Sequence, residues 1–513
     1  MNYLQSTIIP DQNKNKLKSN FLNYLLNLNI LALIITFVIN FLGLPILKYH
    51  YVIHVAIAIA GVFFFDLIEI FPIILTLFFL EGQGRIIWEY DSWSRIIFDL
   101  LISFSVLKIF ISRGKIIDFE KNTTPFVLMI ILHFLSYLLQ FSNINAISYF
   151  VVLASAKLYV LPIFAYLALV QIDFDIYSVK FQKTLNFIIF LIFLEVALAF
   201  YQMYWRESLM LHISPYYSKA MKDGIFTGIH YRPFGTSQLP GAISGILFLT
   251  VGFLYLKKSN FFNNILRHIV LVLMGIAIGF CQVRSAFIKF ILIIVAIRIG
   301  ELIYSRFGLK DVVGIFVVLI IFIGSVQLII DSNSNTGNLG IDYARDRFIT
   351  LTNYDKISSS RINTNKFFTY VIQNISDHPF GISPGLTGAI RDLGVSQMDE
   401  GQLSKLQDTW ASDNLFISLS IDFGIFAIFY IAILFYIPFY FIRFLIEFYR
   451  KKDHGPYTIL LVCFSSVSVI IIGNWGAIGL TYNPESFIFW FFSALGFSTI
   501  AKYKLRNLNI ENF

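Results

Sequence analysis

Charged residues are scarce in this chain. Asp, Glu, Lys and Arg make up 14% of its 513 residues, whereas a soluble domain carries about 25%, enough to cover its surface with solvated groups. Hydrophobic residues make up 57%, including 56 Phe, and the mean hydropathy is +0.72. This composition excludes collagen-like, disordered and cytosolic-enzyme classes and indicates that lipid is the main solvent.

Cysteine is rare as well. The two cysteines, Cys281 and Cys463, both lie inside apolar runs, so we expect no disulfide framework. The net charge of +8 would point to nucleic acid in a soluble protein, but Lys and Arg retained on the cytoplasmic side of a membrane account for it here. We therefore expect the lipid bilayer, and no nucleic acid, as a partner.

Apolar runs long enough to cross a hydrocarbon core, which takes about 20 residues each, recur along the chain. They predict an all-α polytopic membrane protein with about fourteen transmembrane helices, in a range of about twelve to fourteen. Residues 51–81 allow one long tilted helix or two short ones, and two keep the basic cluster at 113–121 inside, as the positive-inside rule requires. The predicted spans are 25–44, 51–65, 66–81, 95–112, 124–141, 147–170, 184–204, 237–256, 268–283, 286–304, 312–330, 414–442, 456–475 and 485–502.

Two loops are longer than the others, and both fall outside in this topology. Long loops without structure are uncommon, and apolar periodicity at 367–372 predicts an amphipathic helix between Arg361 and His378. We therefore expect one large, partly helical extracytoplasmic loop. The predicted layout is a cytoplasmic tail at 1–24, helices 1 to 11 over 25–330 with an external loop near 205–236, the large loop at 331–413, helices 12 to 14 over 414–502, and a cytoplasmic tail at 503–513.

Positive-inside sorting does not explain the basic residues on the external side. Arg232 precedes a span, and Arg284 lies between two apolar runs with almost no loop. An Arg in the apolar zone costs about 2.5–3.5 kcal/mol on insertion scales, so it usually faces a cavity or a partner, although snorkelling to the headgroups is the alternative. Arg361 and Arg391 lie in the large loop, where a plain surface role is the simpler interpretation. Several guanidinium groups around one pocket would suit phosphate, because each fork pairs with two oxygens.

Four short patches follow one another between residues 200 and 430, all with the same predicted sidedness. They are residues 231–236 (YRPFGT), 283–286 (VRSA), 360–361 together with 377–385 (DHPFGISPG), and 412–416 (SDNLF) together with 422–424 (DFG).

In order and spacing these patches resemble the O-antigen polymerase and O-antigen ligase superfamily. Asp413 stands where the ligases of that family have a histidine before the Asn, so the resemblance favours the polymerase. It implies metal-independent transfer of a glycan from undecaprenyl pyrophosphate to a sugar hydroxyl on another lipid-linked repeat unit. The reaction would build a surface polysaccharide, such as O-antigen, capsule or exopolysaccharide, on the outer face of a bacterial plasma (inner) membrane. No cofactor is implied; a chain-length regulator and a flippase are the expected protein partners.

The leaving pyrophosphate gains negative charge, which preorganised cations stabilise. Arg232, Arg284 and Arg361 are the candidate pyrophosphate clamp in place of a metal, because the Asp-x-Asp pair at 173–175 falls on the cytoplasmic side. Asp413 is the first candidate for a base toward the acceptor hydroxyl, although it could instead cap the helix that begins near Asn414. The other candidate catalytic residues are Asp377 and His378, and the other candidate substrate-binding residues are Tyr231, Arg391, Trp410 and Asn414.

Charges within the predicted spans leave another function class open. Such residues are costly in lipid and could form an ion relay in a transporter or flippase of lipid-linked sugars or small anions. The sequence has no matched pair of Gly- or Pro-broken helices in two repeated halves, the usual indication of a transporter. The charged residues are Asp66, Glu69, Lys108, Lys157, Glu195, Lys289 and Asp422.

Overall fold

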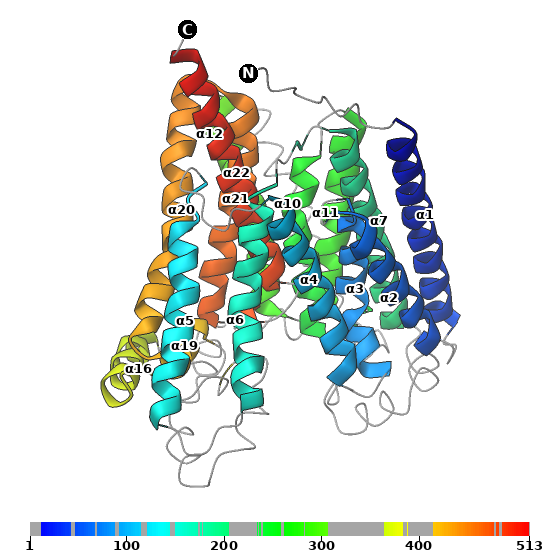
Figure 1. Ribbon diagram of the computed structural model, residues 1–513. Helices are drawn as coiled ribbons and strands as arrows, with labels where there is room; N and C mark the ends of the chain where they lie inside the picture. The colour runs from blue at the N-terminus through cyan, green and yellow to red at the C-terminus, as the bar shows by residue number, and fades with distance from the viewer. Residues whose placement is uncertain are drawn as a thin grey trace, which may run out of the picture.

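The apolar runs form a bundle of α-helices in the computed structural model (Figure 1). The structure describes residues 12–42, 47–66, 69–87, 92–113, 121–143, 149–172, 175–176, 178–204, 233, 235–236, 240–257, 261–281, 283–305, 364–382, 387, 414–476, 479–481 and 485–511. These residues form α-helices and short 3₁₀-helices and contain no strand. The predicted span at 312–330 lies outside them.

The described helices fall into three groups along the chain. The first group comprises α1 (Gln12–Leu42), α2 (Leu47–Phe64), α3 (Phe71–Ile87), α4 (Ser92–Arg113), α5 (Thr124–Asn143), α6 (Tyr149–Leu169) and α7 (Val179–Tyr204). The second comprises α10 (Pro240–Leu256), α11 (Phe261–Cys281), α12 (Arg284–Ser305) and α16 (Thr364–Asp377). The last comprises α19 (Leu415–Phe423), α20 (Phe426–Lys451), α21 (His454–Gly473), the 3₁₀-helices η3 (Asn474–Gly476) and η4 (Gly479–Thr481), and α22 (Glu485–Glu511).

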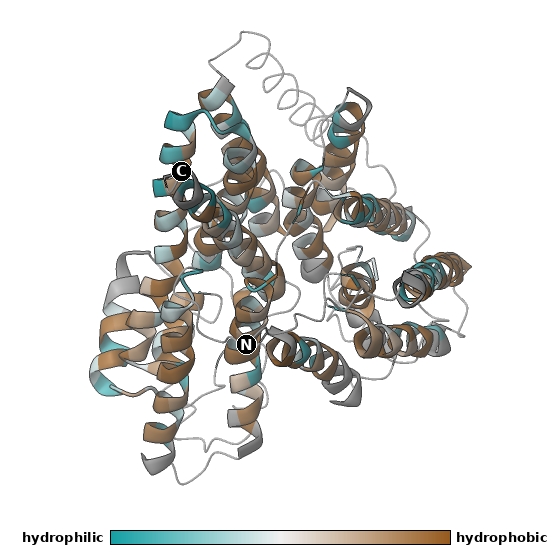
Figure 2. Cartoon of the chain, turned by 45° about the horizontal axis from the view of Figure 1, so that its top comes forward, coloured by the Kyte–Doolittle hydropathy of each residue, from teal (hydrophilic) through white to brown (hydrophobic). Residues whose placement is uncertain are grey.

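Hydropathy assigns the chain to the all-α membrane proteins. Hydrophobic residues cover the helices throughout the bundle (Figure 2), and large apolar side chains such as Phe63 and Phe439 are 74% and 69% exposed on its outside. Lipid is the solvent in which such a surface is stable. By length and composition, five helices among the described residues can cross a membrane: Leu17–Leu42, Val179–Gln202, Asn264–Cys281, Phe426–Lys451 and His454–Gly473. Five shorter apolar helices accompany them: His50–Phe64, Phe71–Leu80, Thr124–Gln140, Leu153–Leu169 and Ile243–Leu256.

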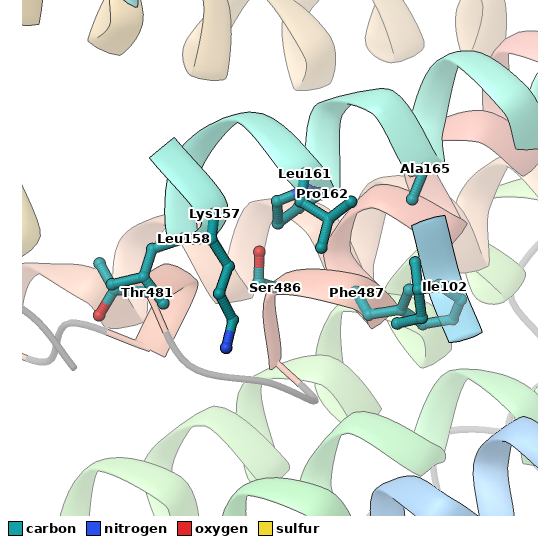
Figure 3. Close-up of a pocket in the computed structure, with 9 residues that line it drawn as sticks. All are labelled: Ile102, Lys157, Leu158, Leu161, Pro162, Ala165, Thr481, Ser486 and Phe487. Atoms are coloured by element: carbon teal, nitrogen blue, oxygen red, sulfur yellow. The ribbon is translucent and has the colours of Figure 1, made fainter. Parts of the chain in front are cut away.

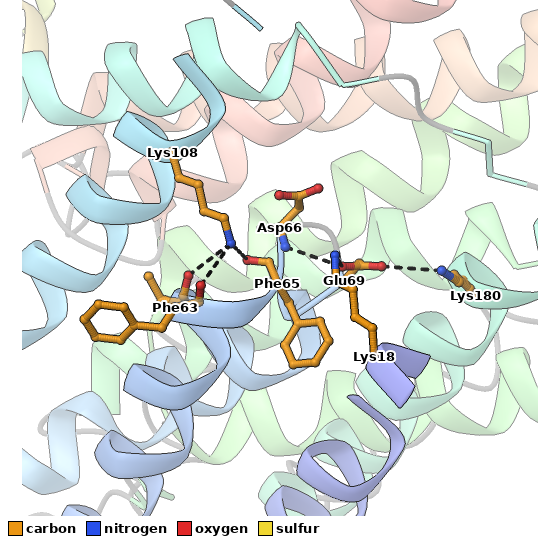
Figure 4. A network of polar contacts seen from close by, with 8 residues as sticks. Lys18, Phe63, Phe65, Asp66, Glu69, Lys108 and Lys180 are labelled. Atoms are coloured by element: carbon orange, nitrogen blue, oxygen red, sulfur yellow. Dashed lines mark hydrogen bonds and ion pairs between the residues drawn. The ribbon is translucent and has the colours of Figure 1, made fainter. Parts of the chain in front are cut away.

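Residues 51–81 form two helices rather than one. α2 ends at Phe64 and α3 begins at Phe71. Lys108 of α4 donates to the carbonyls of Phe65 (3.0 Å) and of Val62 and Phe63 (both 3.4 Å), which satisfies groups that a helix end leaves unpaired. Figure 4 shows these contacts together with Glu69, which lies 3.6 Å from Lys18 of α1 and 3.5 Å from Lys180 of α7.

The prediction of one continuous span at 414–442 is wrong. The chain forms α19, breaks at Gly424 and continues as α20 to Lys451. Gly424 has φ of +54° and ψ of −127°, a backbone conformation that glycine adopts readily and residues with a Cβ rarely do. A Cβ there would also lie 2.3 Å from the carbonyl oxygen of Pro379. The break therefore exists because a segment of the large loop packs into it.

The helices of the C-terminal part pack against one another and against helices from earlier in the chain. α21 and α22 pack against each other, α12 packs on α21, and α6 packs on α22. α1 begins and α22 ends at the same end of the bundle, drawn uppermost in Figure 1 and called the upper end below. At the opposite, lower end lie α16, which forms where the amphipathic helix was expected, and α19.

Candidate functional site

Of the ten predicted site residues, the structure describes four: Asp377, His378, Asn414 and the backbone of Arg284. Asp377, the last residue of α16, and His378, which follows it, are both exposed at the lower end. Asn414 is buried. Arg284 is the first residue of α12, and its backbone alone is described. Outside the described residues lie Tyr231, Arg232, Arg361, Arg391, Trp410 and Asp413.

The patch that contains Arg232 is anchored by its last residues. Gly235 exchanges two hydrogen bonds with the side-chain amide of Gln202 on α7: its N–H donates over 2.8 Å, and its carbonyl accepts over 2.9 Å. The backbone N–H of Thr236 donates to Glu195 Oε2 over 3.1 Å. The Thr236 hydroxyl contacts the Phe79 carbonyl of α3 at 2.7 Å and also Glu195 Oε1. Glu195 is fully buried, so this carboxyl belongs to the packing of the patch.

The first patch also contacts the helix that precedes the second patch. The Cys281 thiol at the end of α11 lies 3.6 Å from the carbonyl oxygen of Pro233. Pro233 directly follows Arg232, and Arg284 comes three residues after Cys281. The fold thus brings together the backbone next to two of the candidate clamp arginines.

A buried ion pair lies beside the first turns of α12. Lys289 Nζ is 2.9 Å from Glu485 Oε1 at the start of α22, and Asn474 Nδ2 approaches the same carboxylate oxygen at 3.4 Å. The ammonium also lies 5.0 Å from the ring centroid of Phe248 on α10, within cation–π range. The ion pair fixes the start of α12, and with it the backbone of Arg284, to the beginning of α22.

The patch at 377–385 packs against the patch at 422–424. The N–H of Ile382 donates to the Ile421 carbonyl, and the N–H of Ile425 donates to the Pro379 carbonyl, both over 2.8 Å. The approach leaves no space for a Cβ: one on Gly381 would lie 2.5 Å from the Asp422 carbonyl oxygen. Residues 379–382 and 421–425 are therefore one structural unit.

Polar side chains from α5 and α6 support this unit. Gln140 Nε2 donates to the carbonyls of Phe380 (2.6 Å) and Asp422 (2.7 Å). The fully buried Asp422 carboxylate accepts from the Tyr159 hydroxyl at 3.1 Å and the Thr387 hydroxyl at 2.8 Å. Gln140 and Tyr159 were not among the predicted site residues, because they lie in the part of the chain where the resemblance offers no patches.

Asn414 is the N-cap of α19. Its side-chain oxygen accepts from the N–H groups of Phe416 (2.9 Å) and Ile417 (3.3 Å), and its Nδ2 donates to the Trp475 carbonyl over 2.8 Å. The alternative that Asp413 caps this helix is therefore wrong. Because Trp475 follows Asn474, the cap also connects α19 to the ion pair of Lys289 and Glu485.

The positive-φ glycines of the described residues all lie in the resembling patches. They are Gly235, Gly381 and Gly424, with φ of +58°, +93° and +54°. Each adopts a conformation that favours glycine, and at each a Cβ would lie within 2.5 Å of another atom. At these three positions the fold thus requires glycine, both for the positive φ and for the lack of space for a side chain.

The charged residues within the helices contact local partners. Besides the ion pair of Lys289, Lys157 pairs with Asp99 of α4. At the upper end, Glu69 contacts lysines of α1 and α7, and Lys108 joins α4 to the end of α2. A cavity of about 20 Å³ beside Lys157, lined also by Thr481 and Ser486 (Figure 3), has room for a water molecule but not for a sugar. In the described part of the chain, no group of three or more His, Cys, Asp or Glu could hold a metal ion.

No protein-family model matches the chain, and no curated protein matches it.

Proposed function

We propose that this protein is a membrane glycosyltransferase that polymerises oligosaccharide repeat units linked to undecaprenyl pyrophosphate. One observation carries the proposal: the described residues of the patches that resemble the polymerases, although far apart in sequence, are linked in one series of contacts and short stretches of chain. The series runs from the Thr236 anchor through Cys281 to α12, through the Lys289–Glu485 pair to Trp475, and through Asn414 along α19 to residues 379–382.

The topology that goes with this function has fourteen transmembrane helices and both termini in the cytoplasm of a bacterium. The upper end is then cytoplasmic and the lower end external. Basic residues at the helix ends of the upper side support this orientation, because Lys and Arg accumulate on the cytoplasmic side. They include Lys18, Lys180, Lys257, Lys451 and Lys504.

In the proposed reaction, the acceptor hydroxyl oxygen attacks the anomeric carbon of the donor glycan. The bond from that carbon to the pyrophosphate oxygen breaks, and undecaprenyl pyrophosphate leaves with the electron pair. Arg232, Arg284 and Arg361 stabilise the charge that develops on it. Asp413 takes the proton of the acceptor hydroxyl, with Asp377 and His378 as the next candidates. Tyr231, Trp410 and Arg391 bind the glycans.

The contacts of Asn414 and of the buried charges sharpen this proposal. Asn414 serves as a helix cap, which gives it a supporting role near the base. Lys108, Lys157, Glu195, Lys289 and Asp422 each hold two helices or a loop together. Such local contacts favour a fixed scaffold over the ion relay of a transporter, in which charged groups face a pathway.

Substitution of the clamp arginines tests the proposal. We expect Arg232→Ala and Arg284→Ala each to abolish elongation of the surface glycan, measured as glycan length on gels, while the protein still inserts in the membrane. Arg443→Ala is the matched control, because Arg443 lies toward the upper end of α20, away from the patches, and its loss should leave glycan length unchanged. Polymer of normal length from both clamp variants would contradict the enzyme.

The products also separate the alternatives. Loss of a polymerase leaves single-repeat products, whereas loss of a ligase leaves full-length polymer on its lipid carrier. Loss of a flippase would instead leave lipid-linked repeat units on the cytoplasmic side.

A further inference from the structure

At the upper end of the bundle, two arginines from different helices contact one tyrosine ring. The guanidinium carbon of Arg267 on α11 lies 4.8 Å from the ring centroid of Tyr255 on α10. The guanidinium carbon of Arg298 on α12 lies 5.4 Å from the same centroid. Both distances are within the range of about 6 Å for cation–π contact. Tyr255 is only 5% exposed, so three helices hold the two guanidinium groups in place.

The charges of this cluster do not cancel. Arg298 Nη1 donates to Glu301 Oε2 over 2.9 Å, and its Nη2 lies 2.9 Å from His268 Nε2. Because that ring nitrogen accepts a hydrogen bond, His268 adds no charge. Arg267 Nη2 donates to the neutral Asn264 Oδ1 over 2.9 Å. The two arginines and the one carboxylate leave a net charge of +1.

Arg267 also has more N–H donors than acceptors around it. In the described part of the chain, its Nε–H is buried and has no acceptor. A guanidinium carries five N–H donors, and leaving a buried donor unpaired is unfavourable. An anion bound at the more exposed Nη side of the two guanidinium groups would supply the missing negative charge.

The cluster lies at the edge of a candidate membrane span, because Arg267 is the fourth residue of the span Asn264–Cys281. Arg267 is the seventh residue from the start of α11, and Arg298 is the eighth residue counted back from the end of α12, so each lies about 10 Å inside its helix end. The polar region of a bilayer adds about 5–7 Å on each side of the hydrocarbon core. Basic residues that only follow the positive-inside rule extend freely into water, whereas these two are held on a buried ring. The side chain of Arg298 is still 24% exposed, so a ligand can reach it.

We propose that Arg267 and Arg298, supported by Tyr255, form a phosphate-binding site at the upper end, separate from the proposed catalytic end. A phosphate group can accept from the N–H groups that Glu301, His268 and Asn264 leave free on the two guanidinium groups, and its negative charge balances the cluster. The phosphate belongs either to the headgroup of an anionic lipid or to a free phosphate ion in solution.

Reconstitution of the full chain in nanodiscs tests the site. A comparison of nanodiscs of phosphatidylcholine alone with nanodiscs that also contain phosphatidylglycerol measures binding of the anionic lipid. Inorganic phosphate added to the phosphatidylcholine nanodiscs measures binding of the free ion. The readouts are lipid copies retained per protein and the midpoint of thermal unfolding. We expect phosphatidylglycerol to stabilise the wild type, and Arg267→Gln or Arg298→Gln each to weaken that response about fivefold. Stabilisation by inorganic phosphate alone would assign the site to the free ion.

Variants at the ring keep the test informative if an arginine variant folds poorly. Tyr255→Phe retains the aromatic face and should respond like the wild type, whereas Tyr255→Leu should lose most of the response. Arg443→Gln is the control for general surface charge, because its guanidinium lies over Phe444 on its own helix. If Arg267→Gln, Arg298→Gln and Tyr255→Leu all keep the full response to phosphatidylglycerol and to phosphate, the site does not exist.

Discussion

Lys289 and Glu485 lie 196 residues apart in the sequence and form an ion pair with 4% and 12% of their side chains exposed. Two glycines make room for it. A Cβ on Gly473 would lie 2.0 Å from Lys289 Cε, and one on Gly479 would lie 2.2 Å from the Glu485 carboxyl carbon. The ends of α12, α21 and α22 therefore meet around one pair of opposite charges.

Removal of one partner should destabilise the protein strongly. We expect Lys289→Met or Glu485→Gln to lower the free energy of unfolding by about 3–5 kcal/mol, because each leaves a buried charge without its partner. Denaturant titration in detergent micelles measures the loss. The double variant Lys289→Met with Glu485→Leu is the control and should recover much of it, because replacing both partners by apolar groups avoids the unpaired charge. Single variants as stable as the wild type would show that the pair is not important to the fold.

The close contact between Gly473 and the Lys289 side chain leads to a second prediction. We expect Gly473→Ala to cost about 1–3 kcal/mol of stability, typical of overpacking, because the new methyl group must displace the lysine stem. The matched control is Gly245→Ala in α10, where a Cβ meets nothing within 4 Å. That variant should be neutral or slightly stabilising, because Ala favours helices over Gly by up to about 1 kcal/mol. Equal thermal stability of the two variants would contradict the packing described above.

The break between α19 and α20 gives a third. Gly424→Ala places a methyl group against the Pro379 carbonyl and puts a Cβ on a residue with positive φ, so we expect residues 379–382 to separate from α19. Limited proteolysis of intact membranes should then cut near residue 380 faster than in the wild type, and the surface glycan should shorten. Gly245→Ala again serves as control. Unchanged protease sensitivity would mean that the two patches are held together by contacts other than this one.

Glu195 gives a fourth prediction, based on hydrogen-bond capacity. Thr236 has one hydroxyl proton but two oxygen neighbours, the Phe79 carbonyl and Glu195 Oε1. An amide can donate to the hydroxyl and still accept from the Thr236 N–H, so Glu195→Gln should preserve stability and glycan length. Glu195→Ala should cost about 1–3 kcal/mol, because it leaves a buried N–H without an acceptor. A loss with Gln as large as with Ala would indicate that the negative charge itself is needed.

The sequence predicts helices well where apolar residues recur at short spacing. The two-helix interpretation of residues 51–81 and the amphipathic helix before His378 are confirmed by α2, α3 and α16. The prediction at 414–442 is wrong because residues 415–423 are as apolar as the span that follows. The break at Gly424 depends on a contact with Pro379, 45 residues earlier in the chain, which no local pattern records.

The supporting residues of the candidate site were harder to predict for the same reason. Glu485, Gln140 and Tyr159 each act on a partner more than 190 residues away. In a single sequence, a polar residue inside an apolar run indicates that a partner exists, because burying an unpaired polar group is costly. It does not indicate which distant residue that partner is. The glycines were a better indication, because the patches selected by resemblance contain Gly235, Gly381 and Gly424.

The burial of α19 has a consequence for how the protein is made. All nine residues of α19 are buried, yet a helix of that length reaches about 14 Å, roughly half of the hydrocarbon core. It cannot be inserted by itself, and its cap needs the carbonyl of Trp475, which is synthesised after α21. During biogenesis, α19 can reach its final position only when the last helices have entered the bilayer. A chain interrupted before α21 would therefore insert most of its helices but never assemble the lower end.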